Sequence, residues 1–127
     1  MNNSVYISML TGKERQMVLD YLYQECVAAS HVHSEILKRT GCMLEAKMKY
    51  ENMATKESVE IYNKLLEKEI KKYLINNLKH SLVLHWVNGT PEKRQIRIRE
   101  YVNTQFQSLS KAEKVAICGR LNLRYLG

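Results

Sequence analysis

The sequence has few residues that end a helix or cross-link a chain. Its 127 residues include one proline, five glycines and three cysteines. So few turn-forming residues favour long helices over many short strands. The cysteines are odd in number, far apart and without a CxxC pair. This pattern predicts reduced thiols in a cytosolic protein and no disulfide framework.

Long hydrophobic runs are also missing. Leu82 to Leu84, a clean apolar run, is followed by His85, Trp86 and Val87, and no apolar run exceeds four residues, far short of the ~20 residues that a membrane span needs. The chain shows no basic-then-apolar segment at its start, so we expect no secretory signal, no membrane association and a cytoplasmic protein. With 45% hydrophobic and 26% charged residues, residues 1–127 are expected to fold as a single domain.

Motifs for catalysis or metal binding are absent as well. There is no glycine-rich phosphate loop and no paired acid–base set. His31 and His33 are two residues apart, so on a helix they point in different directions. His80 and His85 are five apart, which misses the i,i+4 spacing of a helical metal pair. The sequence therefore predicts a protein that is not an enzyme and has no cofactor and no metal site.

Helix signals are present from Thr11 onward. Thr11 and Glu14 have the spacing of a capping box, in which each side chain satisfies a backbone N–H of the other residue. Apolar residues then recur at helical spacing as far as Ile36, and cations precede Gly41. We expect one helix of roughly 25 residues that ends near Lys38 to Gly41.

The segment 42–87 contains neither proline nor glycine. Whether Asn52 to Thr55 divides it into two helices is open, and Leu82 to Val87 suits a short strand or a buried helix end. Pro91 fits the first position of a helix reaching about Gln107. Ser110 and Glu113 form a second capping box, which opens a last helix to about Leu126. The expected fold is all-α, a bundle of four to five helices with one or two long helices and a C-terminal helical hairpin.

Charge is distributed unevenly along the chain. Residues 1–64 carry eight basic and eight acidic residues, whereas residues 65–127 carry twelve basic and five acidic ones. The formal charge of +7 thus belongs to the second half. This arrangement predicts a neutral half that packs and a basic half that meets an anion.

The basic residues of the second half define the candidate nucleic-acid site. On a helix from Pro91, Arg94 and Arg97 lie one turn apart, and a short link leads to further cations on the last helix. Such a pair of helices suits the phosphate backbone of DNA or RNA. The candidate residues are Lys93, Arg94, Arg97, Arg99, Lys111, Lys114, Arg120 and Arg124.

Three interpretations of these cations stay open: solvated helix faces, nucleic-acid contacts, or contacts with an acidic protein. The leading hypothesis is a small regulatory protein that dimerises through its neutral half and binds DNA or RNA, and it predicts that exchanging Arg94 and Arg97 for glutamate abolishes binding. The alternative is an adaptor or inhibitor that docks a helical face on an acidic protein. In that case Met48 and Tyr62 would matter more than Arg97.

Overall fold

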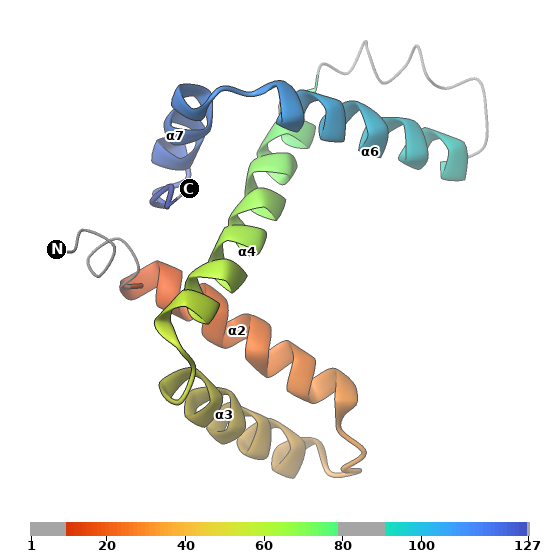
Figure 1. Cartoon of the computed structure of the whole chain (residues 1–127). Coiled ribbons are helices and arrows are strands. Elements are labelled where there is room, and N and C mark those ends of the chain that lie inside the picture. The colour runs from red at the N-terminus through yellow and green to blue at the C-terminus, as the bar shows by residue number, and fades with distance from the viewer. Residues whose placement is uncertain (1–9, 79–90, 127) are drawn as a thin grey trace, which may run out of the picture. The chain divides into compact units, whose positions relative to one another are not determined.

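The computed structural model describes residues 10–78 and 91–126, and within these ranges every regular element is an α-helix (Figure 1). The all-α prediction is therefore confirmed for this part of the chain. The arrangement as a bundle with a C-terminal hairpin stays a prediction. The helices are α2 (Gly12–Ala29), α3 (Glu35–Glu51), α4 (Thr55–Asn76), α6 (Pro91–Ser108) and α7 (Lys111–Arg120).

The first predicted helix is interrupted, so the expectation of one helix to Lys38 is wrong. Its capping box is confirmed, because the Thr11 backbone N–H donates to Glu14 Oε1 at 3.1 Å. The helix then ends at Ala29, and a new one begins after Ser34, whose side chain accepts from the Leu37 N–H. A serine that offers the backbone an alternative hydrogen bond explains why the apolar pattern alone was misleading.

The second break answers a question that the sequence left open. Helix α3 runs through Gly41 and ends at Glu51, and α4 begins at Thr55. At the break, the Asn52 backbone N–H and its side-chain amide both donate to the Met48 carbonyl, the amide at 2.9 Å. This local bonding satisfies the end of α3 and stops its continuation into α4.

The last two helices begin where the sequence places them. Pro91 opens α6, and Ser110 caps α7 with Glu113 as its capping-box partner. The Ser110 N–H donates to Glu113 Oε1 at 2.9 Å. This hydrogen bond, with that of the Ser110 side chain, lowers the pKa of the Glu113 carboxyl from its ordinary range, because it favours the charged form.

Helix α7 is shorter than expected and ends at Arg120 rather than near Leu126. Asn122 adopts a positive φ of 58°, the Leu123 N–H donates to the Cys118 carbonyl, and the Asn122 N–H donates to that of Gly119. These bonds form a Schellman motif, which terminates a helix at a left-handed residue. As a result Arg124 lies beyond α7 and not on it.

The chain forms two compact units, one within Met1–Leu65 and Leu126–Gly127, the other Leu66–Tyr125. The boundary between them lies inside α4 and coincides with the change from neutral to basic sequence. In the first unit, here called the neutral unit, α2 and α3 pack along each other. We call the second the basic unit. The single-domain expectation stays a prediction.

Each unit has its own buried apolar residues. Those of the neutral unit include Val18, Leu22, Cys42, Ala46 and Tyr62, and those of the basic unit include Leu66, Ile70, Val102, Ile117 and Cys118. Tyr62 is completely buried, so it belongs to the core and not to a docking surface as the adaptor hypothesis assumed.

One face of α3 leaves large apolar side chains in solvent. Ile36, Leu37, Met43, Leu44 and Met48 are each between 60% and 78% exposed. Cys42 and Ala46, the residues buried on α3, lie on the opposite side of the helix. We call these five exposed residues the α3 apolar face.

None of the described helices is long and apolar enough to cross a membrane. The segment 82–87, for which a strand or a helix end was considered, lies outside the described residues, as do Asn88 to Thr90 of the expected turn.

Candidate nucleic-acid interface

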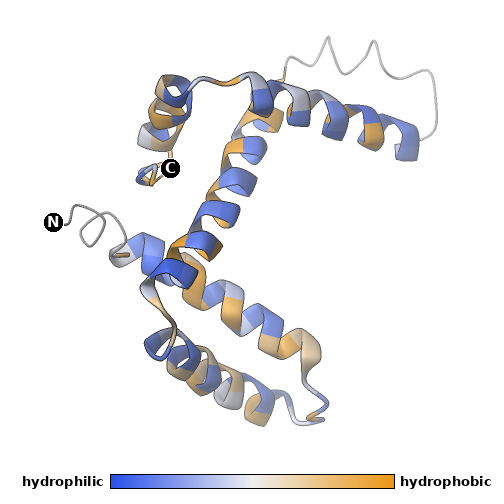
Figure 2. Ribbon diagram, viewed as in Figure 1, coloured by the Kyte–Doolittle hydropathy of each residue, from blue (hydrophilic) through white to orange (hydrophobic). Residues whose placement is uncertain are grey.

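The four candidate cations of α6 lie on a strongly hydrophilic helix (Figure 2). Lys93, Arg97 and Arg99 are exposed, whereas Arg94 is half-buried and its Nε atom is enclosed without a hydrogen-bond partner. Because Val102 on the same helix is buried, one side of α6 is anchored and the exposed cations remain accessible. Arg94 therefore differs from its neighbours and also contributes to packing.

Two lysines from other helices lie over the ring of Phe106. The Lys114 Nζ lies 4.6 Å and the Lys71 Nζ 5.3 Å from the centre of the Phe106 ring. The ring attracts both ammonium groups and so offsets part of their mutual repulsion. Lys71 also pairs with Glu67 at 3.0 Å. The Phe106 cluster, meaning Phe106, Lys71 and Lys114, thus brings α4, α6 and α7 together.

The remaining candidates lie on or after α7. Lys111 is exposed in its first turn, and Arg120 is exposed in its last. The Arg120 guanidinium donates to the Tyr73 hydroxyl at 2.6 Å, which fixes the cation against α4. Arg124 is exposed. All eight candidates therefore belong to the basic unit.

Sequence reasoning missed the contribution of α4 to this surface. From sequence spacing alone, Lys71 is the i,i+4 partner of Glu67 on one helix, and Tyr73 is a residue of a helix–helix boundary. The twelve basic residues of the second half include Lys68, Lys71 and Lys72 on α4, so charge counting contained a signal. The contacts of Lys71 with Phe106 and of Tyr73 with Arg120 depend on the folded unit.

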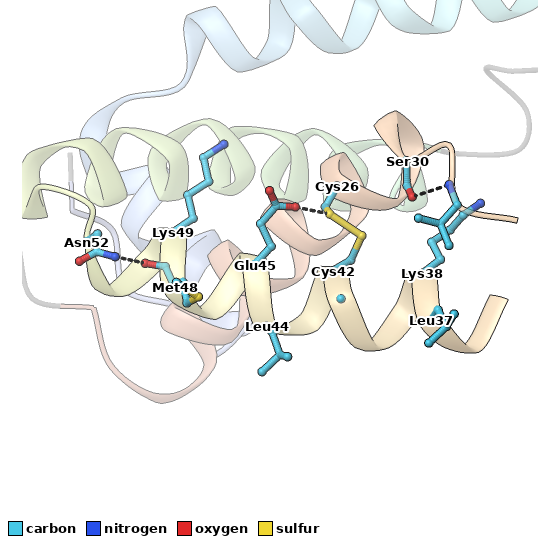
Figure 3. Close-up of a pocket in the computed structure, with 12 residues that line it drawn as sticks. Cys26, Ser30, Leu37, Lys38, Cys42, Leu44, Glu45, Met48, Lys49 and Asn52 are labelled. Carbon is cyan, nitrogen blue, oxygen red and sulfur yellow. Dashed lines mark hydrogen bonds between the residues drawn. A yellow bond between two sulfur atoms is a disulfide. The ribbon is translucent and has the colours of Figure 1, made fainter. Parts of the chain in front are cut away.

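The neutral unit contains a different group of chemically reactive side chains, a pair of cysteines. Cys26 on α2 and Cys42 on α3 form a disulfide, with their Cα atoms 5.5 Å apart (Figure 3). The prediction of reduced thiols is therefore wrong for this pair. The break at residues 30–34 folds α3 back along α2, and this brings together two cysteines separated by 16 positions. Only Cys118 is a free cysteine, and it is buried.

We predict that reducing this disulfide lowers the free energy of unfolding by about 3 kcal/mol, because a cross-link across about 16 residues restricts the unfolded chain. Urea unfolding with and without dithiothreitol measures the change. A variant carrying Cys26→Ser and Cys42→Ser is the control, since dithiothreitol should not alter it further. Equal midpoints for the oxidised and reduced wild type would contradict the prediction.

The disulfide borders an open pocket of about 670 Å³ lined by residues of α2, α3 and the segment between them, and by Asn52 after α3. Figure 3 shows Glu45 directed at Cys26, and Leu44 pointing away from the disulfide. The sulfur atoms of Cys26 and Cys42 and one carboxylate oxygen of Glu45 all lie within 4.8 Å of one another. Their positions in the sequence, with Cys26 far from Cys42 and Glu45, give no sign that the three side chains meet.

No protein-family model matches the chain, and the comparisons with curated proteins and with solved structures also gave no match.

Proposed function

We propose that the chain is a small regulatory protein that binds the backbone of DNA or RNA through its basic unit. The observation that carries this proposal is that the whole charge excess falls within one compact unit, as twelve basic against five acidic residues. Phosphates attract such a surface regardless of base sequence, and binding releases their counterions. The mechanism is occupancy: the protein covers or bridges nucleic acid without a chemical step.

The arrangement of the cations supports this proposal. Lys93, Arg97 and Lys111 are exposed on α6 and α7, where their side chains have access to phosphate oxygens. The Phe106 cluster holds two further ammonium groups at one place. A pairing of α6 and α7 as a helical hairpin and a location in the cytoplasm are part of the proposal. Gln95 is exposed on α6 and has an amide suited to base edges or sugars.

A lysine footprint tests where nucleic acid binds. The full chain is acetylated with and without excess duplex DNA or single-stranded RNA, and mass spectrometry follows each lysine. We expect Lys93 and Lys111 to react several-fold more slowly in the complex, because phosphate covers them. Lys47 and Lys56, exposed in the neutral unit, are the internal controls and should react at unchanged rates. Equal protection of both pairs, or protection of neither, would contradict the proposal.

The α3 apolar face supports a second part of the proposal, a homodimer formed through the neutral unit. Its five side chains each keep 60% to 78% of their surface in solvent. Large apolar side chains exposed together on one helix face are typical of an interaction site.

A second copy suits this face better than a charged partner. The first half of the chain carries equal numbers of acidic and basic residues, so two neutral units do not repel each other. An acidic protein partner, as the adaptor alternative requires, would gain little from a neutral surface. The adaptor alternative is favoured only if the chain is monomeric and the basic unit binds no nucleic acid.

A further inference from the structure

Three side chains in the neutral unit have the chemistry and spacing of a metal site. Cys26 projects from α2, and Cys42 and Glu45 project from α3 (Figure 3). Cys42 and Glu45 are three residues apart, so they share one face of the helix. Two sulfur atoms and one carboxylate oxygen lie within 4.8 Å of one another. Thiolates and carboxylates are both zinc ligands.

The position of the Glu45 carboxylate is more favourable when Cys26 and Cys42 are reduced thiols than when they form the disulfide. Glu45 Oε2 lies 2.6 Å from Cys26 Sγ. In the disulfide that sulfur has no proton, so an anionic oxygen at this distance faces sulfur lone pairs with no attraction to hold it there. In the dithiol, the Cys26 thiol donates to the carboxylate. A zinc ion bound by both atoms would hold the oxygen about 3.5 Å from the sulfur, a separation that rotation of the exposed Glu45 side chain allows.

We propose that reduction converts Cys26, Cys42 and Glu45 into a site for a divalent ion of the zinc class. A cellular dithiol reduces the disulfide and itself becomes a disulfide, which leaves two thiols on the chain. Zn²⁺ then replaces the two thiol protons, which pass to solvent. The protein supplies two thiolates and one carboxylate, and a water molecule from the adjoining pocket completes four-fold coordination.

The geometry of the two helices is compatible with this site. Zinc–sulfur bonds of about 2.3 Å in a tetrahedral arrangement place two thiolates about 3.8 Å apart. Opening the disulfide lets the sulfurs separate to that distance by side-chain rotation, since the Cα atoms are 5.5 Å apart. Glu45 is exposed, so its carboxylate is able to follow. The site lies in the neutral unit and does not depend on the proposed binding of nucleic acid.

Cobalt binding to the reduced full chain under anaerobic conditions tests the proposal. We expect one Co²⁺ per chain, thiolate-to-cobalt absorption in the near ultraviolet, and displacement of Co²⁺ by an equal amount of Zn²⁺. Glu45→Gln should weaken binding by about 10-fold or more, because an amide oxygen is a poorer ligand than a carboxylate. Cys26→Ser should remove the thiolate absorption of a two-sulfur site. Cys118→Ser, the matched control, should bind Co²⁺ like the wild type.

Three results would overturn the proposal: no binding of Co²⁺ or Zn²⁺ by the reduced chain, equal affinity of the wild type and Glu45→Gln, or one ion shared by two chains. Circular dichroism establishes that each variant is helical. If Cys26→Ser does not fold, Glu45→Gln decides alone, because the side chain it replaces is exposed on α3. The oxidised chain should bind no ion, since a disulfide offers no thiolate.

Discussion

Replacing Lys93 and Arg97 by glutamate is expected to weaken binding to duplex DNA by about 100-fold at ~100 mM salt, because each reversal removes a phosphate contact and adds repulsion. Both side chains are exposed and lie one turn apart on α6. Lys93 is in the first turn, where a glutamate is favourable to the helix. Loss of binding would therefore report on the surface and not on the fold. Fluorescence anisotropy measures the affinity.

The matched control carries Lys47→Glu and Lys56→Glu, which change the net charge equally but lie in the neutral unit. We expect this variant to retain most of the wild-type affinity. Equal weakening in both variants would show that total charge, and not the basic unit, governs binding. Arg94 is left unchanged in this variant, although the sequence predicts it as a binding residue, because its half-buried guanidinium contributes to packing.

If the chain forms the homodimer proposed above, replacing Leu44 and Met48 by lysine is expected to convert it to a monomer and raise its dissociation constant at least about 100-fold. Burying each of these apolar side chains contributes about 1.5–3 kcal/mol, and a two-fold interface loses both contributions in each copy. Both residues are more than half exposed on α3, so each copy of the variant chain should still fold. Sedimentation velocity at several protein concentrations measures the change.

Gln16→Lys with Gln24→Lys is the control for this prediction. It adds the same charge at exposed positions of α2 and should leave the dimer intact. A wild-type chain that is monomeric at every accessible concentration would contradict the homodimer. Dissociation of both variants would instead indicate that added charge alone separates the copies.

Local signals in the sequence predicted several helix ends. Pro91 and the Ser110–Glu113 capping box mark the starts of α6 and α7 because each of them acts on the nearest backbone groups. The break before α3 was missed because the apolar repeat continues across it to Ile36. In the structure Ile36 is 78% exposed. The apolar pattern along the sequence therefore includes Ile36, a residue that is not buried between α2 and α3.

The candidate site divides in a similar way. Charge is a property of the sequence, so the basic residues of α6 and α7 were found by counting. The spacing of these residues does not predict which of them pack against the rest of the protein. Arg94, whose Nε atom is enclosed, is an example. The disulfide and the Phe106 cluster arise from contacts between different helices. A pair of cysteines 16 positions apart gives no local signal of such a contact.

The salt dependence of nucleic-acid binding, measured by anisotropy on protein of known oligomeric state, tests whether the basic unit contacts the phosphate backbone. If four or more cations of the basic unit contact phosphates, log affinity should fall linearly with log salt, with a slope of about −4 or steeper on duplex DNA. A slope near zero, or no binding to duplex or single strand at about 50 mM salt, would contradict the claim that the basic unit binds the nucleic-acid backbone.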